Sequence, residues 1–227
     1  IMAYVVDIVP IEIINYPKSG TIQYHPSLLP KHRGPSSINW SIIKGDKETG
    51  ITIFWPDRGL DTGDILIQKK IIIKENDSTG SLYFNSLYPM GVDAIVESIN
   101  LIINGDPPKI PQIEKYATYE GWCEEQEIKW KNTSKDIYNL IRGCDPQPGA
   151  WTLYKGEKIY LYDTKLVSNN VQKENGTILF IDEKEVSVSI GNKKLIIGRI
   201  KSKGKKKINA YEWMVINNIK PSSKLGE

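Results

Sequence analysis

The chain has 227 residues, a length that suits one large domain or two modest ones and allows a sizeable core. Hydrophobic residues make up 40% and charged residues 25%, which excludes wholesale disorder and a fibrous composition. No apolar run approaches the roughly 18 residues that span a bilayer, and the first residues lack the basic region of a signal peptide, so a membrane protein is not expected. The two cysteines and two histidines argue against a disulfide framework and a metal site, and we expect a cytoplasmic protein.

The net charge of +3 is unevenly distributed. Residues 1–150 carry 15 basic and 19 acidic side chains, whereas residues 151–227 carry 15 and 8. The basic excess therefore lies in the last third, where Lys201, Lys203, Lys205, Lys206 and Lys207 cluster. Such a cluster attracts polyanions, and it is equally the composition of a solvated hairpin turn.

The first half of the chain alternates between predicted strands and helices. The apolar run Ala3–Val9 predicts a buried strand, and Ser78 or Thr79 can cap a long helix that runs to about Ile103. Between them lie a short helical turn at Ile11–Ile14, a strand at Gly20–Tyr24, a helix from Ser36 or Ser37 to Lys44, and strands at Ile51–Trp55 and Ile65–Ile73. This alternation predicts an α/β domain with a parallel sheet.

The second half is predicted to be rich in strands. Thr133 or Ser134 caps a helix over Asp136–Arg142, and a brief helix is expected at Tyr211–Ile216. The expected strands are Trp151–Tyr154, Lys158–Val167, Gly176–Ile181, Glu185–Ile190, Lys194–Ile200 and Ile208–Asn209. Short strands at this spacing predict a small β-barrel.

One histidine directly follows a predicted strand, and an acidic turn follows the next strand. His25 comes after the strand 20–24, and the turn 56–64 contains Asp57, Asp61 and Asp64. Ligands of open α/β sheets bind beyond the carboxyl ends of strands, and a carboxylate beside an imidazole suits proton transfer near neutral pH. Spacing alone leaves two interpretations open: a catalytic His–Asp pair, or a histidine that caps a strand beside a solvated turn.

Two motifs surround this pair, HPSLLPKHRG at His25–Gly34 and GLDTGD at Gly59–Asp64. Further stretches are ATYEG at 117–121 and PGAW at 148–151. The motifs, their order and the separation of 36 residues between His25 and Asp61 closely resemble the formyltransferase family, whose members use 10-formyltetrahydrofolate.

The resemblance implies a fold, which is a Rossmann-like α/β core followed by an OB-like β-barrel. In this chain the catalytic domain would cover residues 1–110, a linker 111–125 and the barrel 126–227. The family's catalytic Asn, His and Asp match Gln23, His25 and Asp61, so the first position departs from the family pattern. The residues implied for binding the pterin of 10-formyltetrahydrofolate are Asp7, Ile8, Val9, Asp57, Arg58, Gly59 and Leu60, and no metal is implied.

The implied chemistry is the attack of an amine on the formyl carbonyl, which generates a tetrahedral oxyanion. His25 would stabilise this charge and shuttle a proton, and Gln23 would be a second oxyanion donor. Asp61 would hold His25 and, through a water, take the proton from the incoming amine. Arg33 would either meet a phosphate or carboxylate of the acceptor or pin its own loop.

The acceptor has several candidates. The leading expectation is the amino group of methionyl-tRNA, because the basic residues 151–227 suit a tRNA backbone. The alternatives are a hydrolase or dehydrogenase-type unit, transfer to a sugar nucleotide, and an inactive remnant that binds folate or RNA. The resemblance also implies that the N-terminal part of the catalytic domain is missing, so we expect association through an incomplete N-terminal sheet.

Overall fold

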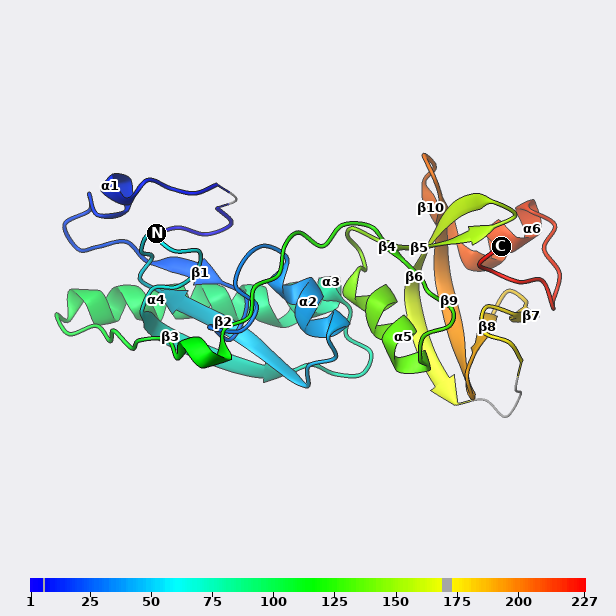
Figure 1. Ribbon diagram of the computed structural model, residues 1–227, viewed down its shortest axis with the longest axis horizontal. Coiled ribbons are helices and arrows are strands. Elements are labelled where there is room, and N and C mark those ends of the chain that lie inside the picture. Colours follow the sequence, from blue (N-terminus) through cyan, green and yellow to red (C-terminus); the bar gives the residue numbers. More distant parts are fainter. Residues whose placement is uncertain (6, 169–172) are drawn as a thin grey trace. The chain divides into compact units, whose positions relative to one another are not determined.

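The computed structural model describes residues 1–5, 7–168 and 173–227, which form two compact units (Figure 1). Unit 1 comprises residues 1–41, 46–77 and 81–123. Unit 2 comprises residues 42–45, 78–80 and 124–227. Unit 1 mixes helices with a small sheet, and unit 2 is rich in β-structure.

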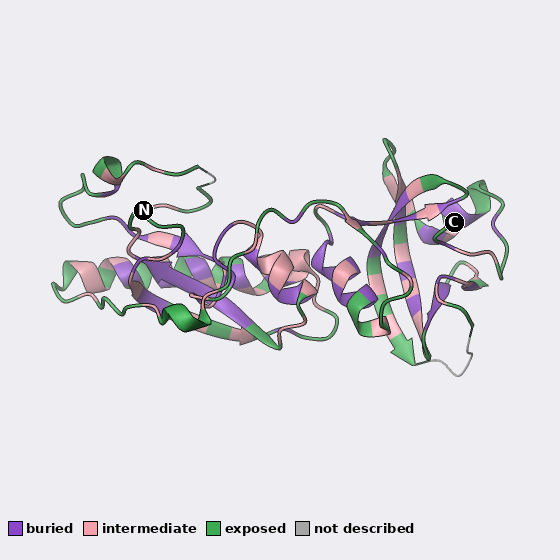
Figure 2. Ribbon diagram, viewed as in Figure 1, coloured by how far each residue is buried: buried purple, intermediate pink, exposed green. Residues whose placement is uncertain are grey.

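A three-stranded sheet forms the centre of unit 1, in the order β1 (Gln23–His25), β2 (Glu48–Phe54), β3 (Ile65–Ile72). Both pairs are antiparallel, so the expectation of a parallel sheet is wrong for this unit. Residues 55–64 join β2 to β3 without a helix, and a parallel crossover needs a longer connection. The middle strand β2 is buried along most of its length (Figure 2), which explains its apolar sequence.

The N-terminal segment does not form the expected strand over residues 3–9. Only Met2 pairs with the sheet, through an isolated parallel bridge to Gln23, and Val6 lies outside the described residues. Tyr4, Val5 and Ile8 are exposed. An apolar β-branched run favours a strand, but it becomes one only where a neighbouring strand accepts its hydrogen bonds. A single helical turn, α1 (Ile11–Ile14), follows.

A long helical segment covers one face of this sheet. It consists of α3 (Thr79–Leu82), the π-helical turn η1 (Tyr83–Leu87) and α4 (Tyr88–Ile103), and α4 packs against β2 and β3. The face of α4 that is buried carries the small residues Gly91, Ala94 and Ser98. A Cβ atom at Gly91 would lie 2.5 Å from the Tyr24 ring, so glycine lets the helix approach β1 closely.

The same segment changes one expectation about membranes. By length and composition alone, residues 79–103 would suffice to cross a bilayer. The sequence analysis missed this because polar residues interrupt every apolar run. One such helix is weak evidence, since the core helix of a soluble protein passes the same test. Here Gly91, Ala94 and Ser98 pack on the sheet, while Val92 and Val96 are exposed.

Unit 2 is built on one mostly antiparallel sheet in the order β4-β5-β6-β9-β8-β7, with β10 paired to β9. Its strands are β4 (Gln126–Glu127), β5 (Ala150–Tyr154), β6 (Glu157–Ser168), β7 (Ile178–Ile181), β8 (Val186–Ile190), β9 (Lys193–Ser202) and β10 (Lys207–Asn209). No strand pairing among the described residues joins β7 back to β4, so the expected closed barrel is not observed. The C-terminal segment instead contacts both sides: Ser222, Ser223 and Leu225 form backbone hydrogen bonds with Ile178 and Gly176, and Gly226 donates to the carbonyl of Leu153.

The helix ends follow local capping chemistry. Helix α5 (Ser134–Gly143) begins after Thr133, whose hydroxyl accepts the N–H of Asp136, as the sequence predicted. Helix α6 (Ala210–Ile216) begins after Asn209, whose carboxamide oxygen accepts the N–H groups of Tyr211 and Glu212. The helix predicted from Ser36 or Ser37 is confirmed as α2 (Ser37–Ile43). Two short elements were not predicted, β4 and a turn of 3₁₀-helix, η2 (Glu114–Tyr116).

Candidate active site

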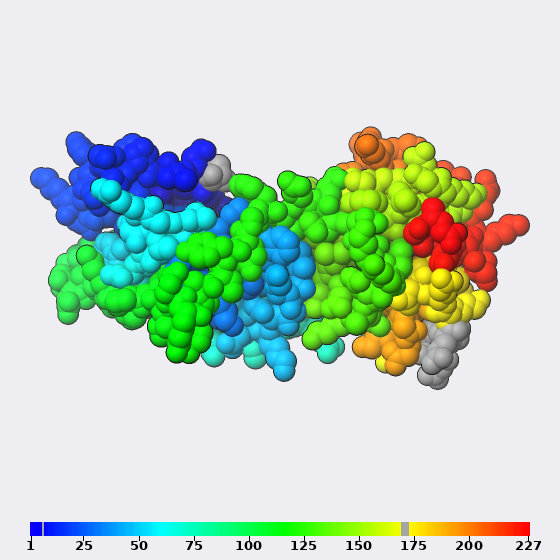
Figure 3. Space-filling view, viewed as in Figure 1, coloured from blue at the N-terminus to red at the C-terminus, as the bar shows by residue number. Residues whose placement is uncertain are grey.

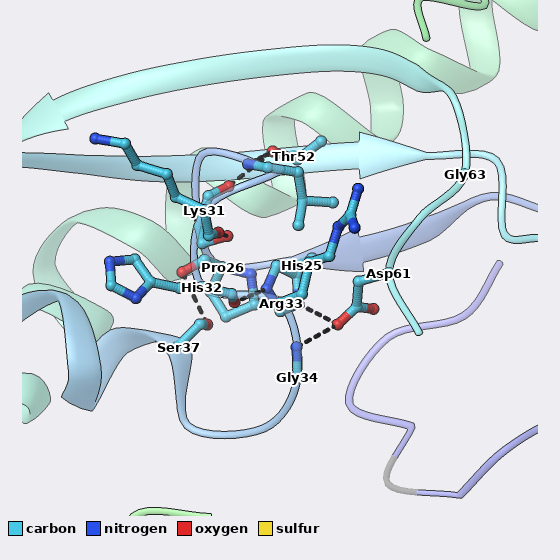
Figure 4. A network of polar contacts seen from close by, with 12 residues as sticks. His25, Pro26, Lys31, His32, Arg33, Gly34, Ser37, Thr52, Asp61 and Gly63 are labelled. Carbon is cyan, nitrogen blue, oxygen red and sulfur yellow. Dashed lines mark hydrogen bonds and ion pairs between the residues drawn. The ribbon is translucent and has the colours of Figure 1, made fainter. Parts of the chain in front are cut away.

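His25 is the last residue of β1 and is only 6% exposed. It pairs with Thr52 of β2, so the sheet fixes its backbone. Its Nε2 atom donates a hydrogen bond to the carbonyl oxygen of His32 at 2.8 Å (Figure 4). Because a carbonyl oxygen can only accept, this contact places a proton on Nε2.

The opposite ring nitrogen faces Asp61. Nδ1 of His25 lies 3.5 Å from Oδ2 of Asp61, and their side chains are 8% and 6% exposed. The same carboxylate oxygen accepts the backbone N–H of Gly34 at 2.8 Å. Residues 36 positions apart in sequence, and expected to pair, are thus brought together in a site that excludes most water.

Burial lowers the pKa of His25 below its ordinary value of 6.5, and the negative charge of Asp61 opposes this only in part. The neutral imidazole, with its proton on Nε2 and a lone pair on Nδ1, is therefore favoured near neutral pH. Nδ1 is the ring atom that can accept a proton, and it does so on the side of Asp61.

The loop after His25 is held by side chains from the sheet and from α2. The hydroxyl of Thr52 donates to the carbonyl of Ser27 at 2.7 Å and accepts the N–H of Leu29 at 3.2 Å. The hydroxyl of Ser37 donates to the carbonyl of Pro26 at 3.1 Å. These bonds fix the loop 26–34, which supplies the His32 carbonyl and the Gly34 N–H used by the pair.

His32 is buried between two carboxylates. Its Nε2 lies 2.8 Å from Oδ2 of Asp46, and its Nδ1 lies 3.1 Å from Oε2 of Glu120. Its backbone N–H donates to the hydroxyl of Thr118 at 2.8 Å, and its φ of +55° is left-handed. A non-glycine residue keeps such a conformation only where its surroundings hold it, and here three side chains do so.

The loop 57–64 carries Asp61 and holds it in position. The φ of Asp61, +56°, is also left-handed. Oδ1 of Asp57 accepts the N–H of Gly59 at 2.9 Å and the hydroxyl of Thr62 at 2.6 Å. A Cβ atom at Gly63 would lie 1.7 Å from the carbonyl oxygen of Trp55, so only glycine fits there. One oxygen of Asp57, a predicted folate-binding residue, thus serves to fold its own loop.

The other residues predicted to bind folate lie in exposed or half-buried positions. Ile8 is 90% exposed and Leu60 is 51% exposed. Gln23 is half-buried on β1, two residues before His25 and therefore on the same side of the strand. Within the part of the chain that the structure describes, its carboxamide makes no hydrogen bond. Residues 7–9 are likewise joined to the loop 57–60 by no hydrogen bond or ion pair between described residues, whereas the catalytic pair is brought together. The predicted residues not yet placed, Asp7, Val9, Arg58 and Gly59, are exposed or half-buried.

Arg33 was expected either to meet the acceptor or to pin its loop, and its contacts correspond to the second role. Its side chain is fully buried, and its guanidinium donates to both carboxylate oxygens of Glu114, each at 2.9 Å. It also donates to Oε1 of Gln112 and to the hydroxyl of Tyr119. Every partner comes from the segment expected to be a linker.

This segment contains residues that contact the loop after His25 and were not predicted to belong to the site. Thr118, Tyr119 and Glu120 lie in the ATYEG motif, which was noted without a role. Gln112 and Glu114 had no local signal, because their partners are 79 and 81 residues away in the chain. No group of three or more His, Cys, Asp or Glu side chains among the described residues is arranged to hold a metal ion.

Two family models match the chain. The model described as Formyl transferase matches residues 1–99, and the model described as Formyl transferase, C-terminal domain, matches residues 123–218. The mitochondrial 10-formyltetrahydrofolate dehydrogenase of Homo sapiens is 44% identical over 173 residues, or 75% of this chain. This chain spans only 19% of the length of that dehydrogenase. A methionyl-tRNA formyltransferase of Desulforamulus reducens is 32% identical over 222 residues, which cover 96% of this chain and 70% of that protein.

Solved structures agree on the fold. HypX from Aquifex aeolicus in complex with tetrahydrofolic acid matches 93% of this chain and 37% of that chain with a TM-score of 0.78, and at 19% identity this likeness concerns the fold alone. An N-formyltransferase from Helicobacter canadensis in complex with folinic acid and dTDP-3-aminofucose matches 78% of this chain and 65% of that chain, with a TM-score of 0.65 at 25% identity. With a relative that is 32% identical and covered over 70% of its length, the chain belongs to the formyl transferase family, whose enzymes depend on 10-formyltetrahydrofolate.

Proposed function

We propose that this protein transfers the formyl group of 10-formyltetrahydrofolate to the amino group of methionyl-tRNA. The observation that carries the proposal is the buried pair of His25 and Asp61, whose geometry leaves the lone pair of Nδ1 beside a carboxylate. A formyl group bound on an amide nitrogen is unreactive toward amines unless protons are moved and the oxyanion is stabilised, and this pair is suited to move protons.

The reaction needs one bond formed, one bond broken and a proton moved. The acceptor nitrogen bonds to the formyl carbon, the bond from that carbon to N10 of the folate breaks, and one proton passes from the acceptor nitrogen to N10. Nδ1 of His25 takes and returns this proton, with Asp61 stabilising the imidazolium while it exists. The Nε2–H contact with His32 keeps the ring oriented throughout.

Three features of the chain suit a folate. The apolar side chains of Ile8 and Leu60 are exposed, and they can cover the face of a flat ring. The Gln23 carboxamide, which makes no hydrogen bond to another described residue, can donate to the developing oxyanion. Asp57, Arg58 and Gly59 offer polar backbone and side-chain groups for the pterin edge.

Two observations support methionyl-tRNA as the acceptor, one from unit 2 and one from the comparison that covers both units. The β9–β10 hairpin projects from the surface of the unit (Figures 1 and 3), and Lys203, Lys205 and Lys206 at its turn are exposed. A basic turn of this kind neutralises phosphates of a nucleic-acid backbone. The methionyl-tRNA formyltransferase matches 96% of the chain, including this unit.

Hydrolysis of 10-formyltetrahydrofolate is the second candidate, with water in place of the amine. It is favoured by the 44% identity to the dehydrogenase over 173 residues and by Gln23, which departs from the family's Asn. The longer side chain moves the amide donor outward by about one C–C bond, which alters the oxyanion contact.

Release of tetrahydrofolate and the fate of the formyl group test both candidates. The full chain is incubated with 10-formyltetrahydrofolate alone, with methionyl-tRNA, and with an amino-sugar nucleotide. Release only with methionyl-tRNA, together with a formylated product, is the expected result. Release without any acceptor would replace the proposal by hydrolysis, and release only with the amino sugar would replace it by sugar formylation. No release under any condition would overturn all three and indicate a non-catalytic folate-binding or RNA-binding protein.

A further inference from the structure

Gln112 joins the loop that carries Asp61 to the loop that holds His25. Its Nε2 donates to the carbonyl oxygen of Asp61 at 2.9 Å and to that of Gly63 at 2.7 Å. Its Oε1 accepts from Nε and Nη2 of Arg33 at 3.2 and 2.9 Å. One carboxamide thus makes four contacts across two loops that are separated by more than twenty residues in sequence.

The orientation of this carboxamide is determined by its partners. The two carbonyl oxygens can only accept and the guanidinium can only donate, so the opposite orientation would satisfy none of the four contacts. Arg33 is itself fixed, because Nη1 and Nη2 donate to the two carboxylate oxygens of Glu114, Nη1 also donates to the hydroxyl of Tyr119, and the side chain is fully buried. Gln112 therefore connects the backbone of Asp61 to an arginine whose position is fixed.

The backbone of Asp61 needs such support. Its φ of +56° is unfavourable for a residue other than glycine, and Gln112 binds the carbonyl of this same residue. On the other side, Arg33 directly follows His32, whose carbonyl receives the Nε2–H of His25. Besides the direct bond from the Gly34 N–H to the Asp61 carboxylate, a second path through Arg33 and Gln112 thus links the carboxylate to the imidazole.

We propose that Gln112 is a positioning residue that sets the separation between Nδ1 of His25 and the carboxylate of Asp61, and that it thereby controls the proton-transfer step. The inference rests on the proposed formyl transfer for its kinetic consequence. Its structural consequence, a displaced Asp61, is independent of which acceptor the enzyme uses.

The test replaces Gln112 in two ways. Gln112→Met keeps the length of the side chain and removes all four hydrogen bonds. Gln112→Asn keeps a neutral carboxamide but is one methylene shorter, so it cannot span both loops, and it is the second variant in case Gln112→Met does not fold. The matched control is Asn175→Leu in unit 2, where the carboxamide also bridges two segments, donating to Trp130 and accepting from Gly191, each at 2.6 Å.

The first readout needs no turnover. The chain has two histidines, so the imidazole signals in an NMR titration are few, and His25→Ala assigns them. The titratable groups facing His25 are Asp61 and His32, which lies between Asp46 and Glu120, and the variants alter none of these groups. Moving Asp61 away removes the charge that supports protonation, so the midpoint for His25 should fall in both Gln112 variants and stay in place in Asn175→Leu.

The second readout is kinetic. A misplaced Asp61 should lower kcat about tenfold to a hundredfold in both Gln112 variants, with little change in KM for 10-formyltetrahydrofolate. An unchanged His25 midpoint in a folded Gln112 variant would overturn the inference, and so would an equal shift in Asn175→Leu. If the native protein shows no formyl transfer at all, the proposed function fails while the NMR titration still decides the role of Gln112.

Discussion

The carbonyl oxygen of His32 lies 2.8 Å from Nε2 of His25, so one histidine of the chain is oriented by the backbone of the other. The contact fixes the tautomer of His25 and directs its free lone pair toward Asp61.

His25→Ala and Asp61→Ala should each abolish measurable turnover of 10-formyltetrahydrofolate. Loss of a general acid–base group costs about 10² to 10⁴ in rate, and either variant removes one half of the pair. Initial rates of tetrahydrofolate release measure the effect, with the exposed Glu75→Gln as a control that should keep the native rate. Full activity in His25→Ala or Asp61→Ala would eliminate the assigned mechanism.

The stability of unit 1 should depend on pH through His25. Burial lowers the pKa of this residue in the folded state, so the unfolded chain takes up a proton at a higher pH than the folded chain does. The free energy of unfolding should fall as the pH drops below about 6.5, the ordinary value for the residue, and the part due to His25 should be missing in His25→Gln. Urea unfolding at a series of pH values checks this, and parallel pH curves for the two proteins would count against it.

Gly91→Ala should destabilise the protein although alanine favours helices. The added methyl group would lie 2.5 Å from the buried ring of Tyr24, and overpacking of this kind costs about 1–3 kcal/mol. Because alanine gains about 1 kcal/mol over glycine in a helix, the net loss should be at most about 2 kcal/mol. Thermal unfolding gives the measurement. Gly121→Ala, where the added methyl group meets nothing within 4 Å, is the control and should be neutral.

Charge reversal in the β9–β10 turn should weaken RNA binding. The triple variant Lys203→Glu, Lys205→Glu and Lys206→Glu removes up to three phosphate contacts, so the slope of log affinity against log salt should become shallower by about two. A fluorescence titration with methionyl-tRNA at several salt concentrations measures this slope. A second triple variant at the exposed Lys131, Lys184 and Lys220 has the same change in charge and should leave the slope near its native value. Equal effects in both triple variants would mean that only net charge matters.

The sequence predicted the elements that depend on local chemistry. The capped helix after Thr133, the long helix from Thr79 to Ile103 and the pairs of strands in unit 2 have clear periodicity or a capping residue, and all are present. The strand direction in unit 1 could not be predicted in this way, because alternation of side chains carries no information on which way a neighbouring strand runs. The connection from β2 to β3 at residues 55–64, which lacks a helix, was the available signal for an antiparallel pair.

Within the site, only the residues that lie in recognisable motifs could be predicted from the sequence. His25 and Asp61 stand in recognisable motifs, and the structure brings them together. The anchoring residues Gln112 and Glu114 lie in a proline-rich stretch that reads as a linker, and their importance arises from Arg33, which is distant in sequence. Buried polar side chains of this kind are defined by their partners, so a local pattern does not reveal them.

The left-handed conformation shared by His32 and Asp61 has a consequence for engineering. Each costs about 1 kcal/mol or more relative to glycine, so a selection of residues by backbone conformation alone would favour glycine at both positions. Such a selection would remove the side chain that faces His25 and the one that anchors its loop. Thermostable forms of this protein should therefore be sought with these two positions held constant. At both positions the backbone conformation favours glycine, whereas the site requires the side chain that is present.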